Sequence, residues 1–149
     1  MKKIISTYKH LLLLLILLSG GVYSYAQNCK DYEKKCSDAP KGFKSSSMSR
    51  SFSMKKQRKV NINQTFYGGR QYYMAVCGKP KLGKIHFRII EDDENKTVLY
   101  DNAADGFTIS KMFAFESTIK LIIEISAPNY FTDNESECAG IVLAYKTIE

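Results

Sequence analysis

Hydrophobic and polar residues alternate through most of the chain from residue 60 onward. The alternating apolar positions form five blocks: Val60 and Ile62; Ile85, Phe87 and Ile89; Val98 and Tyr100; Ile119, Leu121, Ile123 and Ile125; and Ala139, Ile141, Leu143 and Tyr145. A period of two is typical of strands that bury one face. None of the blocks repeats with the spacing of an amphipathic helix. The pattern therefore predicts an all-β chain of seven to eight strands, an antiparallel β-sandwich of the jelly-roll or immunoglobulin-like kind.

Turn signals divide this pattern. Gly68 and Gly69 separate two extended stretches, which predicts a hairpin between residues 60–66 and 71–77. Residues 27–56 are rich in serine and look irregular, although Phe52 and Met54 alternate with polar residues as in a short edge strand. We therefore expect a signal peptide at 1–26, an irregular disulfide-looped segment at 27–56 and a β-sandwich domain at 57–149.

The first 26 residues have the organisation of an export signal. Lys2, Lys3 and Lys9 form a positive region, Leu11–Leu18 is an apolar run, and Ser24-Tyr25-Ala26 offers small residues for cleavage. The run is about half of the ~20 residues that cross a bilayer as a helix. We expect an exported protein, periplasmic or extracellular, that does not span the membrane after cleavage.

Four cysteines follow the expected cleavage point: Cys29, Cys36, Cys77 and Cys138. An even number in an exported chain predicts two disulfides, with three possible connectivities. We favour Cys29 with Cys36, which closes a short loop, and Cys77 with Cys138, which ties two distant strands. Zinc is disfavoured because no paired CxxC spacing is present.

The charge is unevenly distributed along the chain. The formal net charge is +7, and removing three signal lysines from 22 basic residues leaves 19 against 15 acidic ones, or +4. Residues 27–84 hold 14 basic and 3 acidic residues, whereas 85–149 hold 5 and 12. The two halves could interleave in space as a mixed solvated surface, or the basic half could form a face for surface glycans, lipid headgroups or a partner protein. The basic cluster of Lys55, Lys56, Arg58 and Lys59 could contact anions, but a charged edge strand also blocks aggregation between sheets. Nucleic acid is disfavoured for an exported domain.

Aromatic residues supply candidate ligand contacts. Tyr67, Tyr130 and Phe131 could stack on sugar rings or fill a partner's pocket. Tyr130 and Phe131 follow Pro128 in a polar loop, so we expect this pair to be exposed.

Acidic loops supply weak calcium candidates at Asp92, Asp93, Asp101 and Asp105. Their spacing does not match the D-x-[DN]-x-[DN]-G pattern, and hairpin tips are acidic simply because they are solvated. We therefore expect no metal and no cofactor. His86 is the only histidine left after cleavage, and the chain has no Gly-x-Ser-x-Gly motif. No nucleophile–base set is recognisable, so we do not expect an enzyme.

A resemblance to known proteins extends over the run from Gln71 to Asn102. Its motifs are Tyr73, Val76, Cys77-Gly78, Gly83-Lys84-Ile85, Phe87-Arg88-Ile89-Ile90 and Val98-Leu99-Tyr100-Asp101-Asn102. This run resembles small exported bacterial β-sandwich proteins of unassigned function. More distantly it is similar to accessory domains of the pre-peptidase C-terminal type. The resemblance implies a jelly-roll fold and an accessory role without catalytic residues.

Together these observations favour an exported, non-enzymatic binding or accessory module of the bacterial envelope. Its partner would be an envelope protein or a glycan. The alternative is a carbohydrate-binding jelly roll that stacks aromatic residues on sugars, with or without calcium. A small hydrolase that uses His86 is the further alternative.

Overall fold

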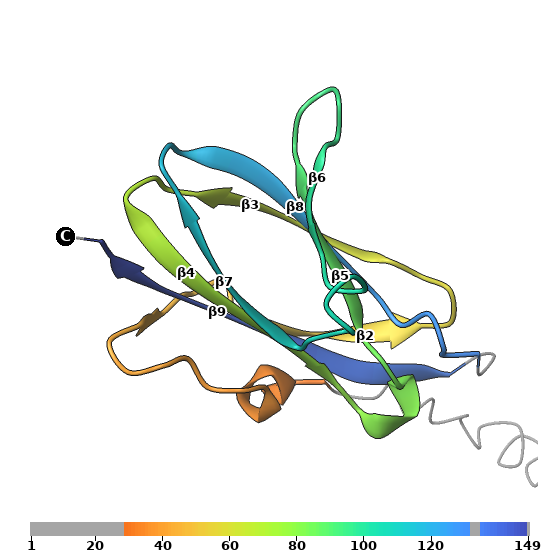
Figure 1. Ribbon diagram of the computed structural model, residues 1–149. Helices are drawn as coiled ribbons and strands as arrows, with labels where there is room; N and C mark the ends of the chain where they lie inside the picture. The colour runs from red at the N-terminus through yellow and green to blue at the C-terminus, as the bar shows by residue number, and fades with distance from the viewer. Residues whose placement is uncertain (1–28, 132–134, 149) are drawn as a thin grey trace, which may run out of the picture.

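The computed structural model describes residues 29–131 and 135–148 (Figure 1). The expected signal peptide at 1–26 lies outside the described residues. Among the described residues, no helix is both long and apolar enough to cross a membrane.

The chain forms two antiparallel β-sheets that face each other, as the alternating pattern predicts. The first sheet contains β1 (Lys44–Ser45), β2 (Arg50–Lys55), β9 (Ser136–Thr147), β4 (Arg70–Gly78) and β7 (Ser110–Phe115). The second sheet contains β3 (Val60–Phe66), β8 (Ile119–Ser126), β5 (His86–Glu91) and β6 (Val98–Asp101). Two short 3₁₀ turns, η1 (Tyr32–Lys35) and η2 (Pro80–Leu82), complete the secondary structure of the described residues. The all-β sandwich prediction is confirmed. Residues 29–131 and 135–148 hold nine strands rather than seven or eight, because the two-residue β1 is present as well.

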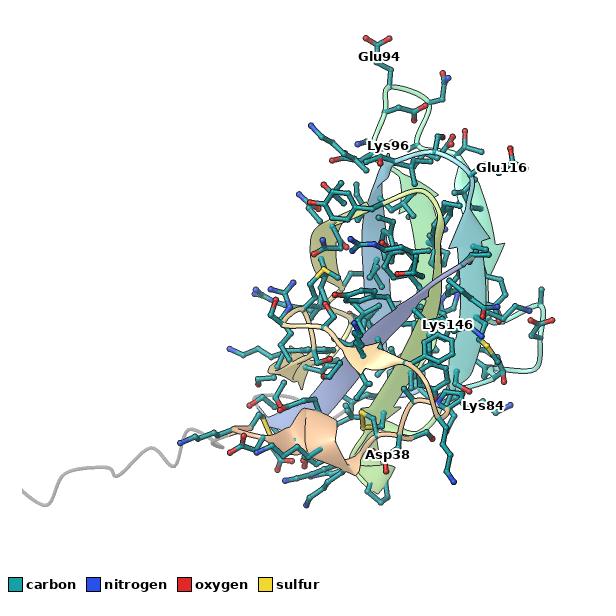
Figure 2. The ribbon with its side chains drawn as sticks, turned by 90° about the vertical axis from the view of Figure 1, so that its left-hand side faces the viewer. Asp38, Lys84, Glu94, Lys96, Glu116 and Lys146 are labelled. Atoms are coloured by element: carbon teal, nitrogen blue, oxygen red, sulfur yellow. A yellow bond between two sulfur atoms is a disulfide. The ribbon has the colours of Figure 1, made fainter. Side chains whose placement is uncertain are left out.

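The strand pairs are nested, which identifies the topology as a jelly roll. The β5–β6 hairpin is the innermost pair, followed outward by β4 with β7, β3 with β8, and β2 with β9. The chain thus resembles one long two-stranded ribbon rolled up, and the pairings β4–β9 and β5–β8 close each sheet. The roll leaves the β5–β6 hairpin projecting beyond the body of the sandwich (Figures 1 and 2).

The predicted hairpin around the glycine pair is wrong. β3 pairs with β8 in the second sheet, whereas β4 lies between β9 and β7 in the first sheet. The segment between them therefore crosses from one sheet to the other. A Cβ on Gly68 would lie 2.5 Å from the carbonyl oxygen of Glu116, so this glycine permits two inter-sheet turns to touch.

The core lies between the sheets and is built from the alternating residues. Its fully buried side chains include Phe87 and Ile89 of β5, Leu121 and Ile123 of β8, and Ile141 of β9. Burial of such aliphatic and aromatic side chains is worth about 1.5–3 kcal/mol each. The predicted inward faces of these strands are confirmed.

The N-terminal segment, residues 29–55, packs on the first sheet. β1 and β2 both pair with β9, so the expected short edge strand at Phe52 and Met54 is present as β2. The sheet therefore includes residues from the 27–56 segment. The residues before β1 lie over the outer face of this sheet, where Phe43 packs edge-on against Tyr73 with 6.3 Å between ring centroids.

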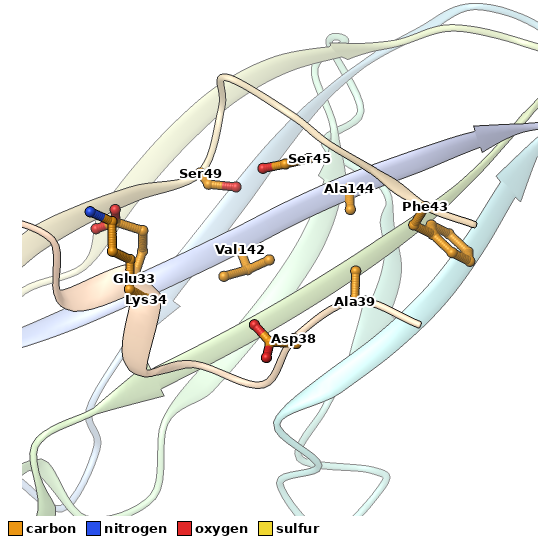
Figure 3. Close-up of a pocket in the computed structure, with 9 residues that line it drawn as sticks. All are labelled: Glu33, Lys34, Asp38, Ala39, Phe43, Ser45, Ser49, Val142 and Ala144. Carbon is orange, nitrogen blue, oxygen red and sulfur yellow. The ribbon is translucent and has the colours of Figure 1, made fainter. Parts of the chain in front are cut away.

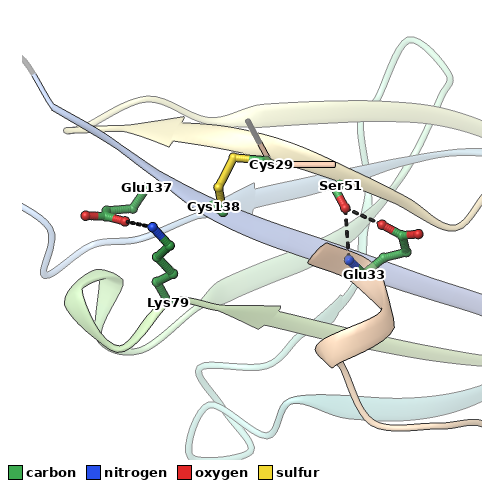
Figure 4. The surroundings of a disulfide bond; sticks show 6 residues. All are labelled: Cys29, Glu33, Ser51, Lys79, Glu137 and Cys138. Carbon is green, nitrogen blue, oxygen red and sulfur yellow. Dashed lines mark hydrogen bonds and ion pairs between the residues drawn. A yellow bond between two sulfur atoms is a disulfide. The ribbon is translucent and has the colours of Figure 1, made fainter. Parts of the chain in front are cut away.

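Both disulfides fasten this segment to the outer face, and the predicted pairing is wrong. Cys29 is bonded to Cys138 of β9 (Figure 4), and Cys36 is bonded to Cys77 of β4. Cys77 lies opposite Gly140 in the β4–β9 register, so Cys138 is its diagonal neighbour. Diagonal Cα atoms lie about 7–8 Å apart, beyond the usual reach of a disulfide. The two strand cysteines therefore find their partners in the segment above the sheet.

Candidate functional site

A groove of about 470 Å³ lies on the outer face of the first sheet, between the N-terminal segment and β9 (Figure 3). Its floor is formed by Val142 and Ala144, which point away from the core because their neighbours Ile141 and Leu143 point into it. Both floor side chains are small. Ala144 is buried under Ala39 and Phe43, whereas Val142 is only half-buried, so the groove is open chiefly above Val142.

The chain frames the groove on both sides. Ala39 and Phe43 from the loop after η1 form one wall, and Ser45 and Ser49 form the other. The Ser49 hydroxyl accepts a bond from the N–H of Leu143 at 2.9 Å and donates to its carbonyl at 3.1 Å. Leu143 lies between the part of β9 that pairs with β1 and the part that pairs with β2. Its backbone groups are therefore satisfied by Ser49 at a place where neither of these two strands pairs with β9.

Three charged residues line the groove. Glu33 and Lys34 lie at the end opposite Phe43, and Asp38 lies beside Val142, between that end and Ala39 (Figure 3). The ammonium of Lys34 is bound by Asp31 at 2.9 Å, and this contact raises the pKa of the lysine. Among the described residues, neither Glu33 nor Asp38 forms an ion pair. The groove therefore has an acidic end within the basic half of the chain.

Two local features hold η1 at this end. The Ser51 hydroxyl of β2 accepts a bond from the Glu33 N–H at 2.9 Å and donates to the Glu33 carboxylate (Figure 4). A Cβ on Gly140 would lie 2.6 Å from the Cα of Glu33, so only glycine permits η1 to approach β9 so closely. The position of the acidic end thus depends on a serine and a glycine that carry no charge.

The three predicted aromatic contacts lie in different places. Tyr130 is buried, with 1% of its surface exposed, so the expectation that it is exposed is wrong. Its N–H closes a turn on the Ala127 carbonyl at 3.1 Å, and the ring packs into the core, where burial raises the pKa of its hydroxyl. Phe131 and Tyr67 are 62% and 52% exposed and remain predicted contacts. Tyr67 is stacked by Arg70 at 5.0 Å. Neither lines the groove.

The predicted basic cluster lies at the turn between β2 and β3. The N–H of Arg58 donates to the carbonyl of Lys55 at 3.2 Å, which forms the turn. Lys59 is paired with Glu124 at 3.1 Å, and Arg88 binds the same carboxylate. Burial raises the pKa of Glu124, but these two cations outweigh burial and lower it overall. The anion-contact role of Lys55, Lys56, Arg58 and Lys59 remains a prediction.

Each of the four calcium candidates is bound to a neighbour in the chain. Asp92 pairs with Lys96 at 2.6 Å, and Asp93 accepts the Lys96 N–H at 2.9 Å. Asp105 accepts hydrogen bonds from the ammonium of Lys111 and from the Tyr100 hydroxyl, and both bonds lower the pKa of Asp105. Asp101 accepts the N–H of Ala103 at 2.8 Å. In the part of the chain that the structure describes, no group of three or more acidic, histidine or cysteine residues could hold a metal.

His86 does have an acidic partner. Its Nε2 lies 2.8 Å from Asp101, on the outer face of the second sheet. Burial raises the pKa of Asp101, but the N–H of Ala103 and the imidazole lower it overall. Within residues 29–131 and 135–148, no serine or threonine hydroxyl hydrogen-bonds to His86. The pair has the geometry of a base and its orienting acid, without a nucleophile beside it.

Sequence reasoning did not single out the groove. Its floor residues lie on the face of β9 opposite the alternating apolar positions that define the strand. One signal was available, because positions 140, 142 and 144 are all small (Gly140, Val142 and Ala144) on what would otherwise be a solvated face. Such a row of small apolar residues indicates that another segment or a ligand covers that face.

Comparisons with known proteins add one structural likeness. No family model matches the chain, and no curated protein does either. The predicted resemblance to pre-peptidase C-terminal domains is therefore not shown. Among solved structures, the chain is similar to Aeromonas hydrophila PliG, a periplasmic lysozyme inhibitor of g-type lysozyme. The TM-score is 0.51 at 12% sequence identity, over 74% of this chain and 93% of PliG. At this identity the likeness shows the fold alone.

Proposed function

We propose that this protein is an exported, non-enzymatic binding module of the bacterial envelope, and that its groove binds a partner protein. Two disulfides support export, because such bonds persist in oxidising compartments and are rare in the cytosol. The absence of a nucleophile beside His86 among the described residues agrees with a role without turnover.

The observation that carries the proposal is the groove itself. The N-terminal segment is fastened to the sheet by both disulfides, and it nevertheless leaves about 470 Å³ open above β9. A segment that only covered the sheet would be expected to fill this space with larger side chains. The volume also falls in the usual range of ligand pockets, about 300–1,000 Å³.

A protein partner is favoured over a free small molecule for two reasons. The groove lies at the surface and is partly open to solvent, and such a groove suits a side chain or a loop of a larger partner. PliG offers a precedent in the same fold, since it is a periplasmic inhibitor of g-type lysozyme. We therefore propose that the partner is a protein of the envelope or a protein that attacks the envelope.

Site-specific photo-crosslinking in the native cell tests this proposal. A photoreactive phenylalanine analogue replaces Ser45, an exposed residue on the groove wall, and in a control strain it replaces Ala114, which is exposed on β7 outside the groove. We expect a discrete protein adduct from position 45 and none from position 114. Equal adducts from both positions, or none from position 45, would reject the groove as the binding surface.

A further inference from the structure

We propose that the groove recognises a basic segment of its partner by taking up one lysine side chain. This inference rests on the proposed function and adds the chemistry of recognition. The lysine stem would lie along the half-buried Val142, and its ammonium would lie on the side of the groove where Asp38 and Glu33 are found.

Charge complementarity is the first argument. Residues 27–84 carry a large excess of positive charge, yet the charged end of the groove contains two carboxylates that lack a cationic partner within the described residues. The one lysine on the rim, Lys34, is held by Asp31. A cation from outside would therefore meet Glu33 and Asp38 without displacing an internal ion pair.

The shape and polarity of the groove are the second argument. A lysine side chain combines an aliphatic stem with a charged head, and it is bound best where an apolar strip ends at an acceptor. The accessible part of Val142 provides the strip, and the carboxylates of Asp38 and Glu33 lie on the side away from Phe43 (Figure 3). At the opposite end, the ammonium of Lys146 already lies 5.2 Å from the centre of the Phe43 ring. A second cation would be repelled there, so the direction of the lysine is fixed.

Glu33 is preorganised for this task. Ser51 fixes its backbone and its carboxylate together, which reduces the entropy lost when a ligand binds. The carboxylate has lone pairs beyond the one that accepts the Ser51 hydroxyl, and these can accept an ammonium. Asp38 is exposed and forms no ion pair with any residue that the structure describes, and it would supply a second acceptor.

The test uses two capped pentapeptides that differ at one position. One has the sequence Gly-Ser-Lys-Ser-Gly, and the other has norleucine in place of lysine, which keeps the stem and removes the charge. The probe is titrated into the isotopically labelled, oxidised protein, and amide shifts are followed by NMR. We expect saturable shifts at Val142 and Ala144 with the lysine peptide, at a dissociation constant of about 1 mM, and binding at least about tenfold weaker with norleucine.

Two matched double variants distinguish binding in the groove from a general effect of the protein's charge. Glu33→Gln/Asp38→Asn removes two charges from the groove, and Glu94→Gln/Glu116→Gln removes two charges from exposed positions far from it (Figure 2). We expect the first variant to lose about tenfold in affinity for the lysine peptide and the second to lose less than about twofold.

Three outcomes would overturn the inference: equal binding of both peptides, equal losses in both variants, or no saturable shift on the groove floor. The proposed function is judged separately by the crosslink at position 45. A crosslinked partner whose yield is unchanged by Glu33→Gln/Asp38→Asn would leave the binding role standing and reject the lysine.

Discussion

Asn102 should be among the most sensitive single residues in this protein. It follows β6 and is fully buried. Its side-chain oxygen accepts the Phe87 N–H at 2.9 Å, and its amide nitrogen donates to the carbonyls of Ile85 and Thr108, each at 3.0 Å. One side chain thus connects the start of β5 to the loop between β6 and β7.

Replacing Asn102 with alanine leaves three polar backbone groups without their partner. A buried group that loses its partner costs about 1–3 kcal/mol, and water entering the space would lower that cost. We therefore expect Asn102→Ala to reduce the free energy of unfolding by about 3–5 kcal/mol. This is a large part of the total stability of a domain, which is about 5–15 kcal/mol.

Urea unfolding of the oxidised protein, followed by circular dichroism, measures this loss. At a slope of about 1–2 kcal/mol per molar urea, the midpoint should fall by about 1.5–5 M. The control is Asn95→Ala at the exposed tip of the β5–β6 hairpin, which should change stability by less than about 0.5 kcal/mol. A loss below about 1 kcal/mol in Asn102→Ala would refute the hydrogen-bond reasoning.

Three further predictions concern the disulfide bridges, the glycine that lies under η1 and the half-buried ion pair of Glu124. Cys29→Ala/Cys138→Ala removes the bridge with a sequence separation of 109 residues and should cost about 5 kcal/mol in thermal unfolding. Gly140→Ala forces Glu33 away from β9 and should speed tryptic cleavage within η1. The pKa of Glu124 is lower in the folded state, so its contribution to stability is present above pH 4.5 and is lost as the pH falls through the folded value. Glu124→Gln should therefore destabilise the protein more at pH 7 than at pH 3 in urea unfolding.

Each of these predictions has its own check. In the variant Cys29→Ala/Cys36→Ala both bridges are lost, so a thiol assay should find two free cysteines, and a single remaining disulfide would contradict the pairing. Ala114→Ser changes an exposed residue of β7 away from η1 and should leave tryptic cleavage within η1 unchanged. Equal destabilisation by Glu124→Gln at both pH values would show that the carboxylate charge does not stabilise the fold.

The strands were predictable because their signal is local. Phe87 and Ile89 alternate with His86 and Arg88, and period two alone places the first pair in the core. The fold class followed from the repetition of such stretches. The same local view failed at Gly68, because a glycine pair permits a tight turn whether the next strand pairs beside the last or crosses to the other sheet. That choice depends on β8 and β9, which come far later in the chain.

The site could not be predicted for the same reason. Tyr130 follows a proline in a polar loop, yet a turn returns its ring to the core. The partner of Cys77 depends on its register against Gly140, which no spacing in the sequence reveals. The groove itself exists only where residues 33–49 meet the outer face of β9, and this meeting requires the complete roll.

The connectivity of the cysteines has a consequence for biogenesis. In an export route that delivers the amino end first, Cys29 and Cys36 reach the oxidant together, while Cys138 is still inside the cell. The first bond to form would then be the incorrect one between neighbours, and only rearrangement could replace it. The yield of the native protein should therefore depend on a disulfide isomerase. A strain without this enzyme should accumulate forms with the wrong disulfide pairing, and reduction before electrophoresis should make these forms migrate like the native protein.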